Sequence, residues 1–169
     1  MDRILVIGCA GAGKSTFSKK LAKQTGLPLT FLDQIYWLPG WVGKQRPLFA
    51  SEIRELIAND KWILDGNYKG TLALRLARAD TVIFLDLNRM KCLWHVLLRT
   101  MRTLGKVRDD MPEGCPEQFN WEFIKFIWRF PQDYRPILIQ RLEGFEGNIV
   151  YLKSLVEYDG YLSSIQNRS

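Results

Sequence analysis

The sequence is poor in the residues that metal centres and disulfide frameworks require. It holds one histidine, His95, and three widely spaced cysteines, Cys9, Cys92 and Cys115, with no CxxC pair. This spacing argues against both a disulfide framework and a zinc site, and we expect reduced thiols. Because a metal cluster or a histidine-based triad lacks partners, we expect a structural role for His95.

Long apolar runs and long runs of like charge are also missing. No apolar stretch approaches the roughly 20 residues that span a bilayer, and the first residues lack the regions of a secretory signal. We therefore expect a cytoplasmic protein with no membrane partner. Tracts of five or more consecutive like charges do not occur either, which makes a disordered nucleic-acid tail unlikely on this pattern.

The composition that is present is typical of one folded domain. The chain has 169 residues, of which 47% are hydrophobic and 25% charged, so residues 1–169 fit a single hydrophobic core. The net charge of +6 is consistent with two kinds of partner, nucleic acid or phosphate groups held in a site. No DNA-reading motif occurs, so nucleic acid has no support beyond charge. The sequence gives no indication of the oligomeric state.

Apolar runs and helical patterns alternate along the chain. We expect strands over 3–7, 29–32, 62–64, 81–86 and 149–152. We expect helices from 14 to about 25 and over 47–59, 71–78, 89–104, 117–130, 133–143 and 155–166, with a break at Pro131. This order predicts an open parallel sheet covered by helices on both faces, an α/β fold of three layers.

The first strand runs into a glycine-rich segment with Walker A spacing. Gly8 and Gly13 are followed by Lys14 and Ser15, and glycines let the backbone N–H groups curl around phosphate. The lysine reaches the β- and γ-phosphates, and the serine hydroxyl binds Mg²⁺. We expect ATP to be held by Gly8, Gly11, Ala12, Gly13, Lys14, Ser15 and Thr16.

Three carboxylates come at the ends of predicted strands. Asp33, Asp65 and Asp86 converge near the phosphate loop if the strands are parallel. Either Asp65 or Asp86 suits a water on Mg²⁺, although an Asp in such a place also caps turns. The remaining carboxylate, Asp33, is a candidate to orient an acceptor hydroxyl.

Several segments together carry a resemblance to a known family. They are Gly8 to Thr16, Leu32-Asp33 followed by residues 36–41, and residues 62–68, 79–86 and 113–116. The chain resembles the nucleoside monophosphate kinase-like P-loop proteins, and within them the adenylate-kinase-related group labelled DNA topology modulation proteins. The resemblance implies a three-layer P-loop NTPase fold with a five-stranded parallel sheet, an acceptor-binding segment at about 33–60 and a short lid at about 99–116.

The same resemblance implies roles for individual residues. Asp65 falls where such kinases have an Asp-Gly that organises Mg²⁺ water, so it ranks above Asp86. Arg99, Arg102 and Arg108 lie where family lids place arginines on the transferring phosphoryl group. The alternative for these arginines is a solvated basic helix face.

The chain also departs from adenylate kinases. The arginines that hold AMP have no clear match, so AMP is doubtful as the acceptor. An Asp directly after the second strand is similar instead to shikimate- and gluconate-kinase-type enzymes, which makes Asp33 the candidate general base. Tyr36, Trp37 and Trp41 form either a wall for the acceptor or a cap on the core.

Two further features are given structural roles. Cys9 lies inside the phosphate loop without a base nearby, so packing is favoured over nucleophilic catalysis. The aromatic residues of the segment 119–130 recur at helical spacing and are predicted to be core or a helix–helix seam. They are Phe119, Trp121, Phe123, Phe126, Trp128 and Phe130.

These patterns favour a small-molecule kinase that uses ATP and Mg²⁺ and transfers the γ-phosphate to an unidentified acceptor. The first alternative is an ATP-binding regulatory protein that affects DNA topology without such activity. The second is simple ATP hydrolysis, which lacks an evident residue to position water.

Overall fold

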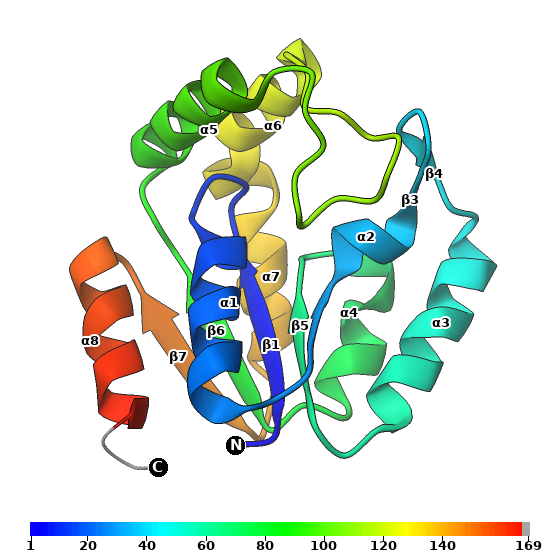
Figure 1. Ribbon diagram of the computed structural model, residues 1–169. Coiled ribbons are helices and arrows are strands. Elements are labelled where there is room, and N and C mark those ends of the chain that lie inside the picture. The colour runs from blue at the N-terminus through cyan, green and yellow to red at the C-terminus, as the bar shows by residue number, and fades with distance from the viewer. Residues whose placement is uncertain (167–169) are drawn as a thin grey trace.

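The computed structural model describes residues 1–166, which form three layers around a parallel sheet (Figure 1). The strand order is β2-β5-β1-β6-β7, and every neighbouring pair is parallel. The strands are β1 (Arg3–Gly8), β2 (Leu29–Phe31), β5 (Trp62–Asp65), β6 (Thr81–Leu85) and β7 (Asn148–Leu152). The predicted five-stranded parallel sheet is confirmed.

The centre of the sheet is also the centre of the core. In β1 the side chains of Ile4, Leu5, Val6 and Ile7 are fully buried, because helices cover the strand on both faces. Register places Leu5 beside Leu64 of β5 and Val82 of β6. The apolar run therefore fixes β1 in the middle, with its carboxyl end at the start of the phosphate loop.

Helices cover both faces of the sheet, as Figure 1 shows. On one face α1 (Lys14–Thr25) packs against α8 (Leu155–Gln166). On the other, α3 (Arg46–Ala58) packs against α4 (Lys69–Leu76), and α7 (Arg135–Leu142) lies nearby. Right-handed crossovers between parallel strands usually give this division in sheets of this kind. None of the helices in residues 1–166 is long and apolar enough to cross a membrane.

A cap of helices and loops stands over the carboxyl ends of the strands (Figure 1). It consists of α5 (Arg89–Thr103), α6 (Trp121–Asp133) and residues 104–120 between them, called here the lid loop. Pro131 was predicted to break the helical run, but α6 continues to Asp133. Pro131 lacks the N–H that would bond to the Ile127 carbonyl, but the Tyr134 N–H still donates to the Phe130 carbonyl at 3.0 Å. The run breaks only at Tyr134, which has φ −114°.

A small hairpin, absent from the sequence prediction, faces the lid loop. After the short helix α2 (Leu32–Tyr36), strands β3 (Trp37–Leu38) and β4 (Val42–Gly43) pair antiparallel. The backbone N–H of Gly40 donates to the Gly114 carbonyl at 2.8 Å. The Cys115 thiol donates to the carbonyl of Leu38 at 3.2 Å. The hairpin and the lid loop are thus joined.

The aromatic segment of α6 is only partly core, which corrects the sequence prediction. Phe130 is buried, and Phe123 and Phe126 are half-buried, whereas Trp121 and Trp128 are exposed. Residues seven apart share one face of a helix, and here that face points to solvent. Phe119, which precedes the helix, is also exposed.

Candidate active site

The phosphate loop is built on backbone conformations that only glycine adopts easily. Gly8 has φ +145° and Gly11 has φ +80°. A Cβ on Gly8 would lie 2.3 Å from the Leu85 carbonyl oxygen, and one on Gly11 would lie 2.3 Å from that of Cys92. The loop therefore rests directly on the end of β6 and the start of α5.

The remaining loop residues open into a cavity. Gly11, Gly13, Lys14, Ser15 and Thr16 line it, whereas Gly8 and Ala12 are buried beneath. The Lys14 ammonium donates to the carbonyls of Gly8 and Cys9, both at 3.1 Å. Helix α1 begins at Lys14, so its unpaired N–H groups and positive dipole end face the same space.

Two side chains hold this loop in place, and neither was predicted to contact it. The Asn67 amide donates to the Gly8 carbonyl at 2.8 Å and accepts from the Gly8 N–H at 3.0 Å. His95 lies 2.9 Å from the Gly11 carbonyl through Nδ1, which must therefore carry the proton. Both contacts brace the backbone that would surround phosphate.

Cys9 has the surroundings of a packing residue. Its thiol is buried, and a hydrogen bond with Cys92 together with burial raises its pKa above the ordinary range. A thiolate is the reactive form of cysteine, so this environment disfavours a nucleophile.

The two strand-end carboxylates that were candidates for magnesium lie in different surroundings. Asp65 lines the cavity and is 5% exposed, and among the described residues its Oδ2 has no hydrogen-bond partner. Burial raises its pKa to about 7, against the opposing charge of Lys14 and the neighbouring Ser18 hydroxyl, which does not reach hydrogen-bond geometry with Oδ2. Asp86 is instead held by Arg135 through two hydrogen bonds of 2.8 and 2.7 Å and does not line the cavity. The buried orphan oxygen of Asp65 suits a cation or its water.

Asp33 lies in the first turn of α2 and also lines the cavity. It accepts a short hydrogen bond from the Tyr68 hydroxyl. Burial, followed by the charge of Asp33, raises the pKa of Tyr68 above its usual range, so the phenol stays a donor. One carboxylate oxygen is thus fixed by tyrosine, which orients the group.

A buried arginine positions the segment that carries Tyr68. Arg75 is fully buried in α4, and burial lowers its pKa to about 9. Its guanidinium donates to the carbonyls of Gly66 at 2.9 Å, of Asn67, and of Tyr68 at 3.1 Å. Tyr68 has φ +32°, a conformation that non-glycine residues rarely adopt. No sequence motif identifies such a backbone-holding arginine.

The aromatic segment after β2 is divided between wall and core. Trp37 and Trp41 line the cavity, with ring centroids 5.5 Å apart. Tyr36 packs instead against Phe49 and Tyr68, at 5.2 and 4.8 Å. Trp37 and Trp41 therefore form part of a cavity wall, Tyr36 packs on the core, and the acceptor role of the wall stays a prediction.

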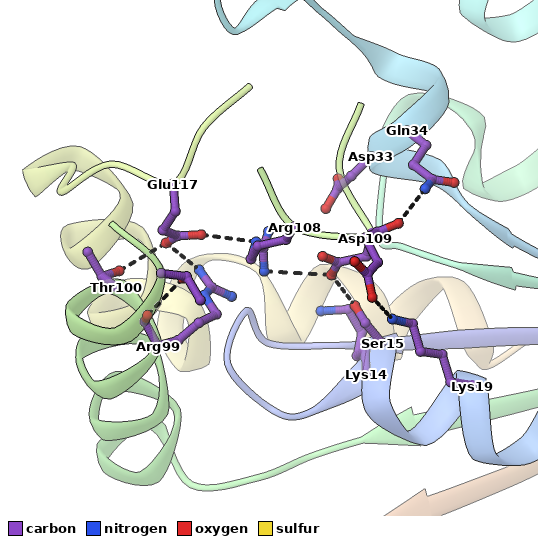
Figure 2. A network of polar contacts seen from close by, with 12 residues as sticks. Lys14, Ser15, Lys19, Asp33, Gln34, Arg99, Thr100, Arg108, Asp109 and Glu117 are labelled. Carbon is purple, nitrogen blue, oxygen red and sulfur yellow. Dashed lines mark hydrogen bonds and ion pairs between the residues drawn. The ribbon is translucent and has the colours of Figure 1, made fainter. Parts of the chain in front are cut away.

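Charged residues of the lid form one network, shown in Figure 2. Glu117, 6% exposed, pairs with Arg99 at 3.1 Å and Arg108 at 3.0 Å, and accepts from Thr100 at 2.9 Å. Burial lowers the pKa of Arg99 most, and the nearby charge of Arg108 lowers it further. The carboxylate holds both arginines at the cavity wall. No pattern around Glu117 in the sequence predicts that it pairs with these arginines.

Two adjacent lid aspartates reach the nucleotide side of the cavity. The Ser15 hydroxyl donates to Asp110 at 2.6 Å, and Arg108 pairs with Asp110 at 3.6 Å. Asp109 pairs with Lys19 at 3.2 Å, and its carbonyl accepts from Gln34 at 2.6 Å (Figure 2). The lid loop is therefore fastened over the phosphate loop and α2.

One predicted lid arginine is not brought to the site. Arg102 is exposed and does not line the cavity. It follows Arg99 by three residues on α5, and the wall is formed by the positions 99 and 103 instead. For Arg102 the structure therefore favours the other interpretation, a basic helix face exposed to solvent.

All these elements enclose one cavity of about 1120 Å³. It is lined by the phosphate loop, Asp33, Asp65, the aromatic wall and the lid loop. Its basic lining residues are Lys14, Lys19, Lys20, Arg99, Lys106 and Arg108. Within residues 1–166 no three His, Cys, Asp or Glu side chains gather as a metal cage. Magnesium sites that share substrate phosphates need only one or two carboxylates.

Solved structures of kinases share this fold. A shikimate kinase from Bacteroides thetaiotaomicron matches with a TM-score of 0.60 and 17% identity, covering 99% of this chain and 97% of that one. A shikimate kinase from Acinetobacter baumannii, in complex with shikimate, matches with a TM-score of 0.60 and 16% identity, covering 99% and 93%. At this identity the likeness shows only that this chain shares its three-layer α/β fold with these two kinases.

Sequence comparison adds nothing to this. No protein-family model matches the chain, and no curated protein is significantly similar to it. The two solved structures lend no support to the DNA topology modulation label.

Proposed function

We propose that this protein is an ATP-dependent phosphotransferase that moves the γ-phosphate of ATP to a hydroxyl group of a small molecule. The observation that carries the proposal is convergence: the phosphate loop, Asp33 and the lid arginines Arg99 and Arg108 all line one cavity. A nucleotide-binding protein without an acceptor has no need for an oriented carboxylate opposite its phosphate loop. Kinases of the same fold support the proposal.

Each group has a distinct task in this proposal. Lys14 and the N–H groups at the start of α1 bind the phosphates, and Ser15 and Asp65 hold Mg²⁺ directly or through water. The metal neutralises charge on the β- and γ-phosphates. Arg99 and Arg108 stabilise negative charge on the transferring group.

The acceptor side has its own chemistry. Asp33 accepts the proton of the attacking hydroxyl while Tyr68 keeps the carboxylate oriented. Trp37 and Trp41 offer faces for stacking, and no Arg or Lys from the acceptor segment 33–60 lines the cavity in the described structure. We therefore favour an acceptor with a flat ring and no carboxylate, such as a nucleoside.

Transfer of labelled γ-phosphate from ATP to a panel of acceptors tests this function. The panel should hold nucleosides, nucleotides and sugars, together with shikimate, with which a protein of this fold was solved. Asp33→Asn should lower transfer by about 10²–10⁴-fold. Asp60→Asn, an exposed aspartate outside the cavity, is the matched control and should transfer normally.

The regulatory alternative makes an opposite prediction. Six basic side chains line the cavity, where they suit phosphates. Absence of transfer to every acceptor, together with DNA binding that weakens steeply with salt, would overturn the kinase proposal.

A further inference from the structure

The proposed function leaves Asp110 unexplained. This carboxylate belongs to the lid loop, yet it lies 2.6 Å from the hydroxyl of Ser15, the serine expected to hold Mg²⁺. Its side chain is only 13% exposed. A carboxylate beside a triphosphate site is unfavourable unless a cation lies between the negative groups.

The distance between the two oxygens fits a shared metal ion. Mg²⁺ binds six oxygens at about 2.1 Å, so two neighbouring ligands of one octahedron lie about 3 Å apart. Ser15 Oγ and Asp110 Oδ2, at 2.6 Å, are close to that spacing already. Only a small separation would allow both to contact one ion.

A second observation points to a cation at the same place. Asp65, which lines the cavity and is more than nine-tenths buried, has an Oδ2 atom without a partner in the described structure. Asp33 and Asp110 line the same cavity as Asp65, so the three carboxylates face one space. Lys14 and Arg108 are the basic groups facing them. Phosphates entering this space would add further negative charge.

We propose that Asp110 is a lid-borne ligand of the magnesium ion, which makes metal binding and lid closure a single event. The inference rests on the proposed function, because Mg²⁺ is expected to enter with ATP. Arg108 turns from Asp110, its partner at 3.6 Å, toward the phosphates, and Asp110 keeps Ser15 as its neighbour at the metal. The lid is then held shut only around a complete metal–nucleotide complex.

The alternative is that Asp110 obstructs the site. A carboxylate that merely occupies the place of a phosphate must be displaced by ATP, so its removal would tighten nucleotide binding. Removal of a metal ligand would instead weaken the binding of Mn²⁺ to the nucleotide complex. The two possibilities therefore differ in sign.

Binding of Mn²⁺ to the complex of the protein with the β,γ-imido analogue of ATP tests the proposal without turnover. Loss of the free Mn²⁺ signal in electron paramagnetic resonance gives the dissociation constant. Asp110→Asn keeps an acceptor for Ser15 but loses the charge, and should raise this constant at least about tenfold. Affinity for the analogue in EDTA should not fall, because without metal the carboxylate only repels the phosphates. Asp110→Glu should recover part of the loss.

Glu113→Gln is the matched control. Glu113 belongs to the same lid loop but is exposed and does not line the cavity, so Mn²⁺ binding should stay unchanged. Unchanged or tighter Mn²⁺ binding in Asp110→Asn would overturn the ligand role and leave the kinase proposal intact. A wild-type protein that binds no analogue at all would overturn both.

Discussion

Asp65→Asn should make the apo protein more stable at neutral pH. The wild-type carboxyl has a pKa of about 7 in the folded chain because it is buried, and its ordinary value is 3.8. Between these values the folded state keeps a proton that the unfolded state has released. The Asp65 carboxyl therefore contributes most to the free energy of unfolding below about pH 4. This contribution falls as pH rises to about 7 and is constant above that pH.

The magnitude follows from the width of that window. Each pKa unit corresponds to about 1.4 kcal/mol, so ionisation of Asp65 costs the wild type about 4 kcal/mol at pH 8 and about 1 kcal/mol at pH 4.5. An asparagine does not ionise, but its amide leaves a buried donor unpaired, which costs about 1–3 kcal/mol at every pH. The free-energy difference between variant and wild type should therefore shift by about 3 kcal/mol over this range.

Urea unfolding in EDTA, at steps between pH 4.5 and 8, measures the effect. Asp86→Asn is the control, because Asp86 is paired with Arg135; its loss should destabilise the protein by about 1–2 kcal/mol. A stability difference between Asp65→Asn and wild type that stays constant with pH would refute the reasoning. It would mean that the folded protein tolerates the charge.

Three other substitutions test the supports of the site. Gly11→Ala should abolish binding of the ATP analogue in calorimetry, because its Cβ would meet the Cys92 carbonyl at 2.3 Å; normal affinity would contradict this. Tyr68→Phe should lower kcat about tenfold and leave the KM for ATP unchanged, since only the orientation of Asp33 is lost; an unaltered kcat would count against it. Arg75→Met should reduce the free energy of unfolding by about 2–3 kcal/mol, because three carbonyls lose their donor; equal stability in urea would show that the loop holds itself.

The sheet and most helices could be predicted from the sequence because their signals are local. A buried strand such as β1 is an unbroken apolar run, and α1 ends near residue 25, as predicted, at Gly26 in the left-handed conformation that glycine adopts easily. The hairpin of β3 and β4 escaped prediction, since its strands have two residues each. Short segments of this kind are stabilised by contacts with a distant loop.

The candidate site also has one part that the sequence predicts and another that it does not. The phosphate loop is one contiguous motif, so its residues were named in advance. Glu117 and Asp110 belong to a loop whose charges of both signs gave no hint of partners, and their contacts with Arg99 and Ser15 join distant parts of the chain. The outward turn of Trp128 was also hidden, because helical spacing does not say which face meets the core.

In the proposed kinase, the joint between the hairpin and the lid loop would control how ligands enter. Gly40 and Gly114 hold the rim together through their backbones, and the Trp41 indole donates to the carbonyl of Pro116 at 3.1 Å. Asp109 fastens the same loop to α1. The hairpin and the lid loop thus share one seam. In the proposed kinase, opening this seam would admit ATP and the acceptor together, and closing it would exclude water from both.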